Sequence, residues 1–483
     1  MKDITTFGEL KAKGYQTKSI NDELRNNLID LLKNNQNPFE GIIGYETTVI
    51  PQLERAILSK HSINLLGLRG QAKTRIARSL VNLLDEWIPV IQGSSINDDP
   101  FKPVSKFAKD LITEKGDATP VEWLHRDRRF FEKLATPDVT VADLIGDIDP
   151  IKAANLKLSY ADERVIHYGM IPRANRCIFV INELPDLQAR IQVALFNILQ
   201  EGDVQIRGFQ IRLELDLQFV FTANPEDYTN RGSIVTPLKD RIGSQILTHY
   251  PLNREIAKQI TEQEAVIADE LVKSIHIPDL AKDLLEQISF EARNSEFIDV
   301  KSGISARMTI TAFENLVSTV ELRLLSSKES ETVVRMSDLL GVIPAITGKV
   351  ELVYEGEQEG TEGVANILIG SAIKTLFAEY FVEIKSLSKP GEYDDFDRLI
   401  EWFIQNPGFE LITNITNDDY NNALNAIEPL ESIVEKFQPN IKGNDRTFIK
   451  EFILWALVEY KKLDKKKFEA GYEFEDNILG RLS

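Results

Sequence analysis

The sequence predicts an α/β core, a parallel β-sheet with helices on both sides, followed by a long helical region. Three observations predict this fold. A glycine-containing loop at residues 67–74 separates a short apolar run from a segment with helical spacing. Two further apolar runs, 177–181 and 217–222, have the length of buried strands and are followed by polar residues. Beyond residue 253, apolar residues recur mostly at helical intervals.

The composition indicates an ordinary globular protein, with 43% hydrophobic and 27% charged residues among 483. This length suits about three domains. The formal net charge of −19 disfavours a broad surface for nucleic acid or acidic membrane. Cys177 is the single cysteine, which excludes an intrachain disulfide and a cysteine-rich zinc site. No segment resembles a signal peptide or approaches the ~20 apolar residues that span a bilayer, so we expect a cytoplasmic protein.

The loop Gly-Leu-Arg-Gly-Gln-Ala-Lys-Thr, from Gly67 to Thr74, has the layout of a phosphate-binding P-loop. Glycines let backbone N–H groups turn toward an anion, and the following helix adds partial positive charge. Lys73 would reach the terminal phosphates and the Thr74 hydroxyl would bind Mg²⁺. Ala72 stands where the second glycine of such loops usually lies. The loop alone also fits a glycine turn before a structural helix.

Polar residues end the two other predicted strands. Asn182 and Glu183 follow the run 177–181, in the place where P-loop ATPases carry Asp-Glu. An amide at residue 182 can hold a metal-bound water but brings no charge, whereas Glu183 would polarise the attacking water. Asn224 follows the run 217–222 and is well placed to orient that water. Its alternative role is to initiate a turn before Pro225.

Four other segments have two interpretations each. Ile43 would pack on an adenine, or its segment would only staple the helix predicted at 47–59. The basic cluster at 126–129 would be a solvated face or form structural ion pairs, or would reach a neighbouring subunit's nucleotide. Arg241 would reach a neighbour's γ-phosphate, or would form a surface ion pair with Asp240. The lysine-rich segment 461–467 would complement the end of a helix predicted at 447–460, or would bind nucleic acid.

These elements occur in a characteristic order: the P-loop, the Asn-Glu strand, a predicted hairpin at 204–213, the strand before Asn224, Asp-Arg at 240–241 and Ser-Ala-Arg at 305–307. The set resembles the AAA+ ATPases and, among them, the ATPase subunit (subunit I) of magnesium chelatase and the MoxR group. The Gly-Gln-Ala-Lys-Thr form of the loop is typical of this branch. An inserted segment at 138–171 and the hairpin also fit it. The resemblance covers roughly residues 39–350.

The resemblance implies ATP and Mg²⁺ as cofactors, with Thr74 and Asn182 on the metal side. It implies that Glu183 is the catalytic carboxylate and Asn224 the first sensor. Arg241 would be an arginine finger acting on the neighbouring subunit, and Arg307 a second sensor at the start of a helix. The nucleotide-binding residues would be Ile43, Gly67, Gly70, Gln71, Ala72, Lys73 and Thr74.

We expect a chain divided into an N-terminal helical segment (1–38), an AAA+ core (39–252), a helical lid (253–345) and a helical C-terminal domain (346–483), of which the resemblance covers the core and the lid. Such proteins form homo-oligomeric rings, usually hexamers, and typically work with a partner that carries a von Willebrand factor A domain. The leading hypothesis is therefore a ring-forming ATPase that remodels or activates a partner protein, of chelatase or MoxR-chaperone type.

Two other classes remain in competition. A nucleotide-dependent scaffold or switch would result if Asn182 weakens Mg²⁺ binding. A DNA-acting motor is disfavoured by the net charge and by a predicted hairpin that carries only Arg207 and Arg212 as basic residues.

Overall fold

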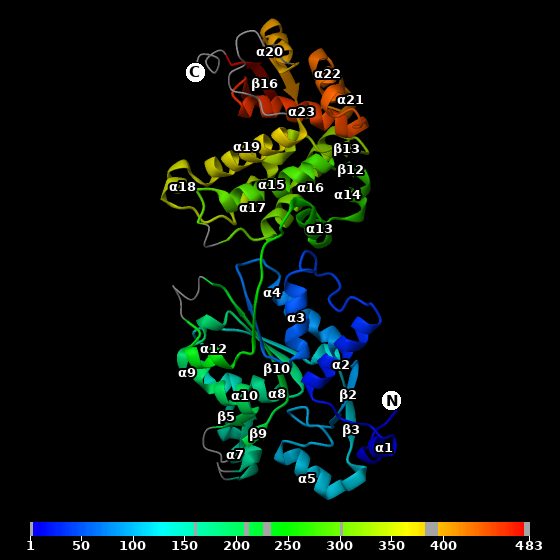
Figure 1. Cartoon of the computed structure of the whole chain (residues 1–483), viewed down its shortest axis with the longest axis vertical. Helices are drawn as coiled ribbons and strands as arrows, with labels where there is room; N and C mark the ends of the chain where they lie inside the picture. The colour runs from blue at the N-terminus through cyan, green and yellow to red at the C-terminus, as the bar shows by residue number, and fades with distance from the viewer. Residues whose placement is uncertain are drawn as a thin grey trace. The chain divides into compact units, whose positions relative to one another are not determined.

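The computed structural model describes residues 3–158, 162–206, 212–225, 233–299, 303–381 and 395–477. The chain divides into two compact units, Met1–His249 and Tyr250–Ser483 (Figure 1). Each buried hydrophobic cluster of the described residues lies within one of these units. The finer division at residues 38, 252 and 345 stays a prediction.

The first unit is built on a five-stranded, all-parallel sheet in the order β11-β1-β10-β7-β4. The predicted α/β core is therefore confirmed. Because all strands run in one direction, their carboxyl ends lie at one edge of the sheet. The strands are β1 (Ile63–Leu66), β4 (Phe130–Leu134), β7 (Cys177–Asn182), β10 (Leu217–Ala223) and β11 (Ser244–Leu247).

Helices cover both faces of this sheet. Side chains alternate along β7, so that Ile178 and Val180 pack on one face, and Phe179 and Ile181 on the other. The first face is covered by α2 (Ile20–Lys33), α3 (Val49–Leu58) and α4 (Lys73–Ser79). The second is covered by α8 (Met170–Arg173), α9 (Ala189–Ala194), α10 (Phe196–Glu201) and α12 (Thr236–Arg241).

Smaller elements surround the sheet. The predicted hairpin at 204–213 is confirmed as an antiparallel pair, while residues 207–211 at its tip, Arg207 among them, lie outside the described residues. Two further antiparallel pairs, β2–β3 and β5–β6, were not predicted in full. The remaining elements are α1 (Phe7–Ala12), β2 (Trp87–Ile91), α5 (Lys106–Lys115), β3 (Val121–His125), α6 (Val141–Leu144), β5 (Gly146–Ile148), α7 (Pro150–Leu156), β6 (Ile166–Tyr168), β8 (Asp203–Gln205), β9 (Arg212–Glu214) and short 3-10 helices at 80–83, 116–118, 126–128, 163–165 and 184–186.

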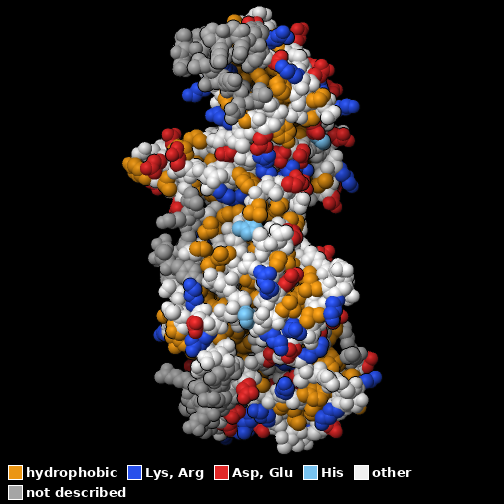
Figure 2. Space-filling view, viewed as in Figure 1, with side chains coloured by type: hydrophobic (Ala, Val, Ile, Leu, Met, Phe, Trp, Pro, Cys, Tyr) orange, Lys and Arg blue, Asp and Glu red, His pale blue; other side chains and the backbone are white. Residues whose placement is uncertain are grey.

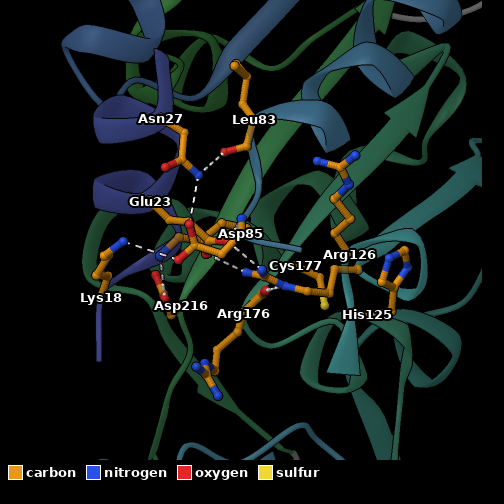
Figure 3. Close-up of polar contacts among 12 residues, drawn as sticks. Lys18, Glu23, Asn27, Leu83, Asp85, His125, Arg126, Arg176, Cys177 and Asp216 are labelled. Atoms are coloured by element: carbon orange, nitrogen blue, oxygen red, sulfur yellow. Dashed lines mark hydrogen bonds and ion pairs between the residues drawn. The ribbon is translucent and has the colours of Figure 1, made fainter. Parts of the chain in front are cut away.

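A buried ion pair joins α2 to the sheet. Both guanidinium Nη atoms of Arg129 donate to the carboxylate of Glu23, at 2.6 and 2.7 Å, and neither residue is more than 3% exposed. Arg129 Nε also donates to the backbone oxygen of Arg176. Figure 3 shows Glu23 beside Asp85. The Asp85 carboxylate accepts hydrogen bonds from Lys18 and Asn27. The structural interpretation of the basic cluster at 126–129 is thus confirmed for Arg129.

The second unit is mainly helical, as predicted, around a single core. Its central helix is α23, in which ten consecutive residues from Phe448 to Leu457 are buried. The helices are α13 (Arg254–Glu264), α14 (Asp269–Ser274), α15 (Asp279–Asn294), α16 (Arg307–Ser327), α17 (Ile343–Thr347), α18 (Tyr354–Glu359), α19 (Thr361–Tyr380), α20 (Asp395–Gln405), α21 (Asn417–Asn425), α22 (Glu428–Phe437), α23 (Gly443–Glu459) and a 3-10 helix at 336–342.

This unit also contains strands that the sequence analysis did not predict. A parallel pair is formed by β12 (Ile275–His276) and β13 (Thr332–Val333), and an antiparallel sheet by β14 (Phe409–Ile412), β16 (Gly471–Asp476) and β15 (Leu463–Phe468). The interpretation of 461–467 as a helix-end complement was wrong for its later lysines. They lie on β15, at the edge of the sheet, where lysines are common. Lys465 packs its ammonium over the Trp455 ring.

Within the described part of the chain, no helix is both long enough and apolar enough to cross a bilayer.

Candidate nucleotide-binding site

The P-loop follows β1 and leads directly into α4, which begins at Lys73. Gly70 and Ala72 both have left-handed backbones, with φ of 71° and 54°. Glycine adopts this conformation freely, whereas alanine does so at a cost of roughly 1–2 kcal/mol. The loop thus keeps the backbone path that the usual second glycine would favour, even though residue 72 is alanine.

Two polar side chains brace the P-loop from behind. The Thr248 hydroxyl donates to Gln71 Oε1 at 2.8 Å, and Gln71 is only 6% exposed. A Cβ atom added to Gly67 would collide with both of these side chains. The Tyr45 hydroxyl donates to the backbone oxygens of Gln71, at 3.1 Å, and of His249, at 2.7 Å. The loop is therefore held by side-chain hydrogen bonds from outside it, and a side chain at residue 67 would have to displace Thr248 and Gln71.

The segment that carries Ile43 lies beside this brace. Ile42 is buried in the core of α3, which agrees with the staple interpretation, while Ile43 is only half-buried. Tyr45, two residues further along, is the residue that contacts the P-loop. Part of the Ile43 side chain is therefore accessible, and its contact with an adenine stays a prediction.

The Lys73 ammonium lies within the loop. It donates to the backbone oxygens of Gly67, at 2.5 Å, and Leu68, at 3.0 Å, and the residue is 8% exposed. Thr74, next on α4, is exposed. The cation is thus held close to the backbone that would surround a phosphate.

The polar residues at the end of β7 form a hydrogen-bonded chain across three strands. Asn182 Nδ2 donates to Glu132 Oε1 on β4 at 2.5 Å. The Thr222 hydroxyl on β10 donates to Asn182 Oδ1 and accepts from the Glu183 N–H, both at 3.1 Å. Glu183 has a left-handed backbone, with φ of 53°. Each end of the Asn182 amide therefore has its own partner.

The sheet brings most of the predicted site residues to one edge. The P-loop, Asn224 and the Asn182-Glu183 pair follow the carboxyl ends of β1, β10 and β7, and these strands are neighbours. Ligands of open α/β sheets bind at this edge. Asn224 is 2% exposed there.

The two predicted arginines lie elsewhere. Arg241 ends α12, where its Nε donates to Gln200 Oε1, its Nη1 donates to the Pro237 oxygen, and its guanidinium lies over the Phe196 ring. Arg307 begins α16 in the second unit and is exposed. Their roles stay predictions.

The sequence analysis missed several residues of this site. Thr222 had a signal, because it is a polar residue at the end of an apolar strand. Glu132 had none, since β4 was not predicted. Tyr45 and Thr248 are distant from the P-loop in sequence, so that only the fold brings them to it.

The available donors fit Mg²⁺. The Thr74 hydroxyl, the Asn182 amide and the carboxylates of Glu132 and Glu183 are all oxygen donors, the class that Mg²⁺ prefers. The Lys73 ammonium within the P-loop, at the start of α4, fits a phosphate chain.

Comparisons with known proteins find relatives of part of this chain. Residues 121–242 match an AAA domain of the dynein-related subfamily, a span that includes Asn182, Glu183, Asn224 and Arg241 but not the P-loop. The chain is 26% identical over 251 residues to the chloroplastic magnesium-chelatase subunit ChlI of Nicotiana tabacum, covering 50% of this chain and 55% of that protein. It is 25% identical over 245 residues to the magnesium-chelatase 38 kDa subunit of Cereibacter sphaeroides, covering 48% and 65%. The chain thus spans about half to two thirds of these curated relatives.

Solved structures are more distant. A chain from the cryo-EM-based complex of the magnesium-chelatase subunits BchI and BchD aligns over 66% of this chain and 98% of its own length, with 20% identity and a TM-score of 0.34. A RuvB mutant of Thermotoga maritima aligns over 92% and 97%, with 12% identity and a TM-score of 0.37. The sequence comparisons confirm the resemblance predicted from the motifs: residues 121–242 match the AAA-domain model, and the chain resembles, among the AAA+ ATPases, the ATPase subunit of magnesium chelatase.

Proposed function

We propose that this chain is a ring-forming ATPase that couples ATP binding and hydrolysis to the remodelling or activation of a partner protein. One observation carries the proposal: the P-loop, the Asn182-Glu183 pair and Asn224 follow three neighbouring strands at one edge of a parallel sheet. In this arrangement the triphosphate of a bound nucleotide would contact the phosphate-binding, metal-binding and water-positioning groups at the same time.

Each residue then has a separate task. The backbone N–H groups of the P-loop and the Lys73 ammonium bind the phosphates, and Ile43 contacts the base. Thr74 and Asn182 hold Mg²⁺, which when bound would neutralise developing charge on the phosphates. The Glu183 carboxylate polarises the attacking water, and the Asn224 amide orients it.

A ring follows from the proposed role of Arg241. As an arginine finger it would act on the γ-phosphate bound by the neighbouring subunit, so each site needs two copies of the chain. Arg307 would act as a second sensor. We propose a homo-oligomeric ring, most simply a hexamer, on the strength of the family resemblance.

The partner is proposed from the same resemblance. A protein with a von Willebrand factor A domain is the expected partner, with metal insertion or MoxR-like chaperone activity as the work performed. The relatives named as magnesium-chelatase subunits favour the first. A cytoplasmic location stays a prediction. Nucleic acid is disfavoured by the net charge of −19, and on the face in Figure 2 basic side chains are interspersed with acidic ones.

A second candidate is a nucleotide-dependent scaffold or switch that hydrolyses ATP weakly. The observation that favours it is Asn182, which brings no negative charge to the metal side. In that case ATP binding would assemble the ring, and turnover would contribute little.

Steady-state ATP hydrolysis by the full chain tests the proposal. Wild type should turn over with Mg²⁺, and Lys73→Ala, Glu183→Gln and Arg241→Ala should each lose activity by at least about a hundredfold. Mixing Arg241→Ala with Glu183→Gln should restore part of the rate, because an intact Glu183 then meets an intact Arg241 of the neighbour. ATP binding by wild type without turnover above Glu183→Gln would favour the switch instead.

A further inference from the structure

We propose that Glu132 is a positioning residue for the Mg²⁺ side of the nucleotide site. Its carboxylate holds the Asn182 amide with the oxygen toward the P-loop, and so offsets the absence of an aspartate at residue 182. The inference rests on the proposed function, because it assigns a role within the same site.

The orientation follows from hydrogen-bond chemistry. An ionised carboxylate only accepts hydrogen bonds, so a short contact with the Asn182 side chain requires the amide nitrogen to face Glu132. That contact is 2.5 Å long, between Asn182 Nδ2 and Glu132 Oε1. At the other end of the amide, the Thr222 hydroxyl donates to Oδ1. Glu132 and Thr222 thus specify one of the two possible orientations.

The strand order decides where the amide oxygen lies. Glu132 is on β4, at the sheet edge away from the P-loop, and Thr222 is on β10, between β7 and β1. The nitrogen of Asn182 therefore faces away from the P-loop strand, and its oxygen faces toward it. An oxygen on that side can bind Mg²⁺ directly or accept a hydrogen bond from a Mg²⁺-bound water.

The negative charge lies on Glu132 of β4, one strand away from residue 182 of β7, where P-loop ATPases carry an aspartate. An aspartate at residue 182 would place a second carboxylate at hydrogen-bond distance from Glu132, and two carboxylates that close oppose each other's ionisation. Asn182 and Glu132 are thus a matched pair, with the negative charge on β4 and the oriented oxygen on β7.

Pairing with Arg78 at the surface is not a sufficient explanation for the position of the Glu132 carboxylate. Its Oε2 accepts from Arg78 on α4 at 2.7 Å, but the Arg78 side chain is 64% exposed, and such pairs contribute at most about 1 kcal/mol. The Glu132 side chain is 22% exposed, and its other oxygen is directed to Asn182. Arg78 thus occupies Oε2 and leaves Oε1 to the Asn182 amide.

The test is the Mg²⁺ dependence of nucleotide binding. The full chain is titrated with a fluorescent ATP analogue in EDTA and at increasing Mg²⁺. Glu132→Gln should raise the Mg²⁺ concentration needed for tight binding about 10- to 100-fold, the usual effect of losing a partner of a metal ligand. Its affinity in EDTA should be unchanged. Glu122→Gln, the same substitution at an exposed carboxylate of β3, is the matched control and should behave as wild type.

Exchanging the carboxylate and the amide between residues 132 and 182 should restore the response to Mg²⁺. In Glu132→Gln/Asn182→Asp the glutamine amide can donate to the new carboxylate, so the Mg²⁺ requirement should return to within a few-fold of wild type. Without metal, Asn182→Asp alone should unfold at a lower temperature than this double variant.

The following results overturn the inference: Glu132→Gln that matches Glu122→Gln, a folded double variant that does not regain the Mg²⁺ response, or wild type that binds the analogue with no gain from Mg²⁺. None of these results contradicts the proposal that the chain binds ATP. Wild type that binds no analogue, with or without Mg²⁺, instead overturns the proposed function and the inference with it.

Discussion

A side chain at Gly67 of the P-loop would have no free space. The Thr248 hydroxyl and the Gln71 side chain fill the space that its Cβ would occupy, and these two groups also hydrogen-bond to each other. A methyl group at residue 67 would have to displace these two side chains and break the hydrogen bond between them.

Substitution of this glycine should therefore weaken nucleotide binding. We expect Gly67→Ala to weaken binding of a fluorescent ATP analogue at least tenfold, because the new methyl group displaces the brace behind the loop. Gly363→Ala is the control: its Cβ would meet the nearest atom, Glu359 Cβ, at an ordinary 3.7 Å. Unchanged binding by Gly67→Ala would show that the brace does not hold the loop in its binding shape.

Among the elements of the first unit, α2 depends on a buried charge. Removal of one partner of a buried ion pair leaves the other without compensation, at about 3–5 kcal/mol. We expect Glu23→Gln to lower the free energy of unfolding by this amount, since Arg129 stays buried at 1% exposed. Urea denaturation measures the change.

The matched control for Glu23→Gln is Lys18→Gln. The Lys18–Asp85 pair lies in the same neighbourhood but is partly exposed, so its loss should cost less than about 1 kcal/mol. Equal effects of the two substitutions would contradict a special role for the buried pair.

In the second unit, α23 carries a buried carboxyl that should make stability depend on pH. Glu451 is 1% exposed and accepts from the Met336 N–H, with Asp338, Arg335 and Tyr420 around it. Burial raises its pKa from 4.5 to about 7. Because the folded state binds the proton more tightly than the unfolded chain, this stabilisation is complete below about pH 4.5 and is lost as pH rises through about 7.

Glu451→Gln should remove this dependence, since glutamine resembles the protonated carboxyl. Relative to wild type, its free energy of unfolding should be about 3 kcal/mol higher at pH 8 and nearly equal at pH 4.5. Denaturation at both pH values measures it. Glu435→Gln, at a side chain 72% exposed, is the control. A variant that loses stability equally at both pH values would contradict the prediction.

The elements that could be predicted from sequence are those with a continuous physical signal. Strands β1, β7 and β10 are apolar because both faces are covered, and the polar residues after them mark the site. Edge strands lack this signal. Glu132 and Lys133 interrupt β4, and lysines dominate β15, because an edge strand is partly solvated. The Glu132–Asn182 contact joins residues 50 apart, so no local pattern could indicate it.

At the scale of the whole molecule, the separate hydrophobic cores imply separate folding. The described residues of the first unit bury clusters on both faces of their own sheet, and those of the second bury one cluster around α23. A unit of 249 residues lies at the upper end of the usual domain size. The P-loop and the polar strand ends all belong to this first unit.

A fragment of residues 1–249 should therefore fold without the rest of the chain and keep nucleotide binding. We expect a cooperative thermal transition, and binding of a fluorescent ATP analogue that is lost in the same fragment with Lys73→Ala. Hydrolysis should be weaker than in the full chain, because the proposed second sensor, Arg307, lies in the second unit. A fragment with no cooperative transition would mean that the first unit needs the second in order to fold. A folded fragment with full turnover would remove the proposed role of Arg307, since the site would then be complete within the first unit and its copies.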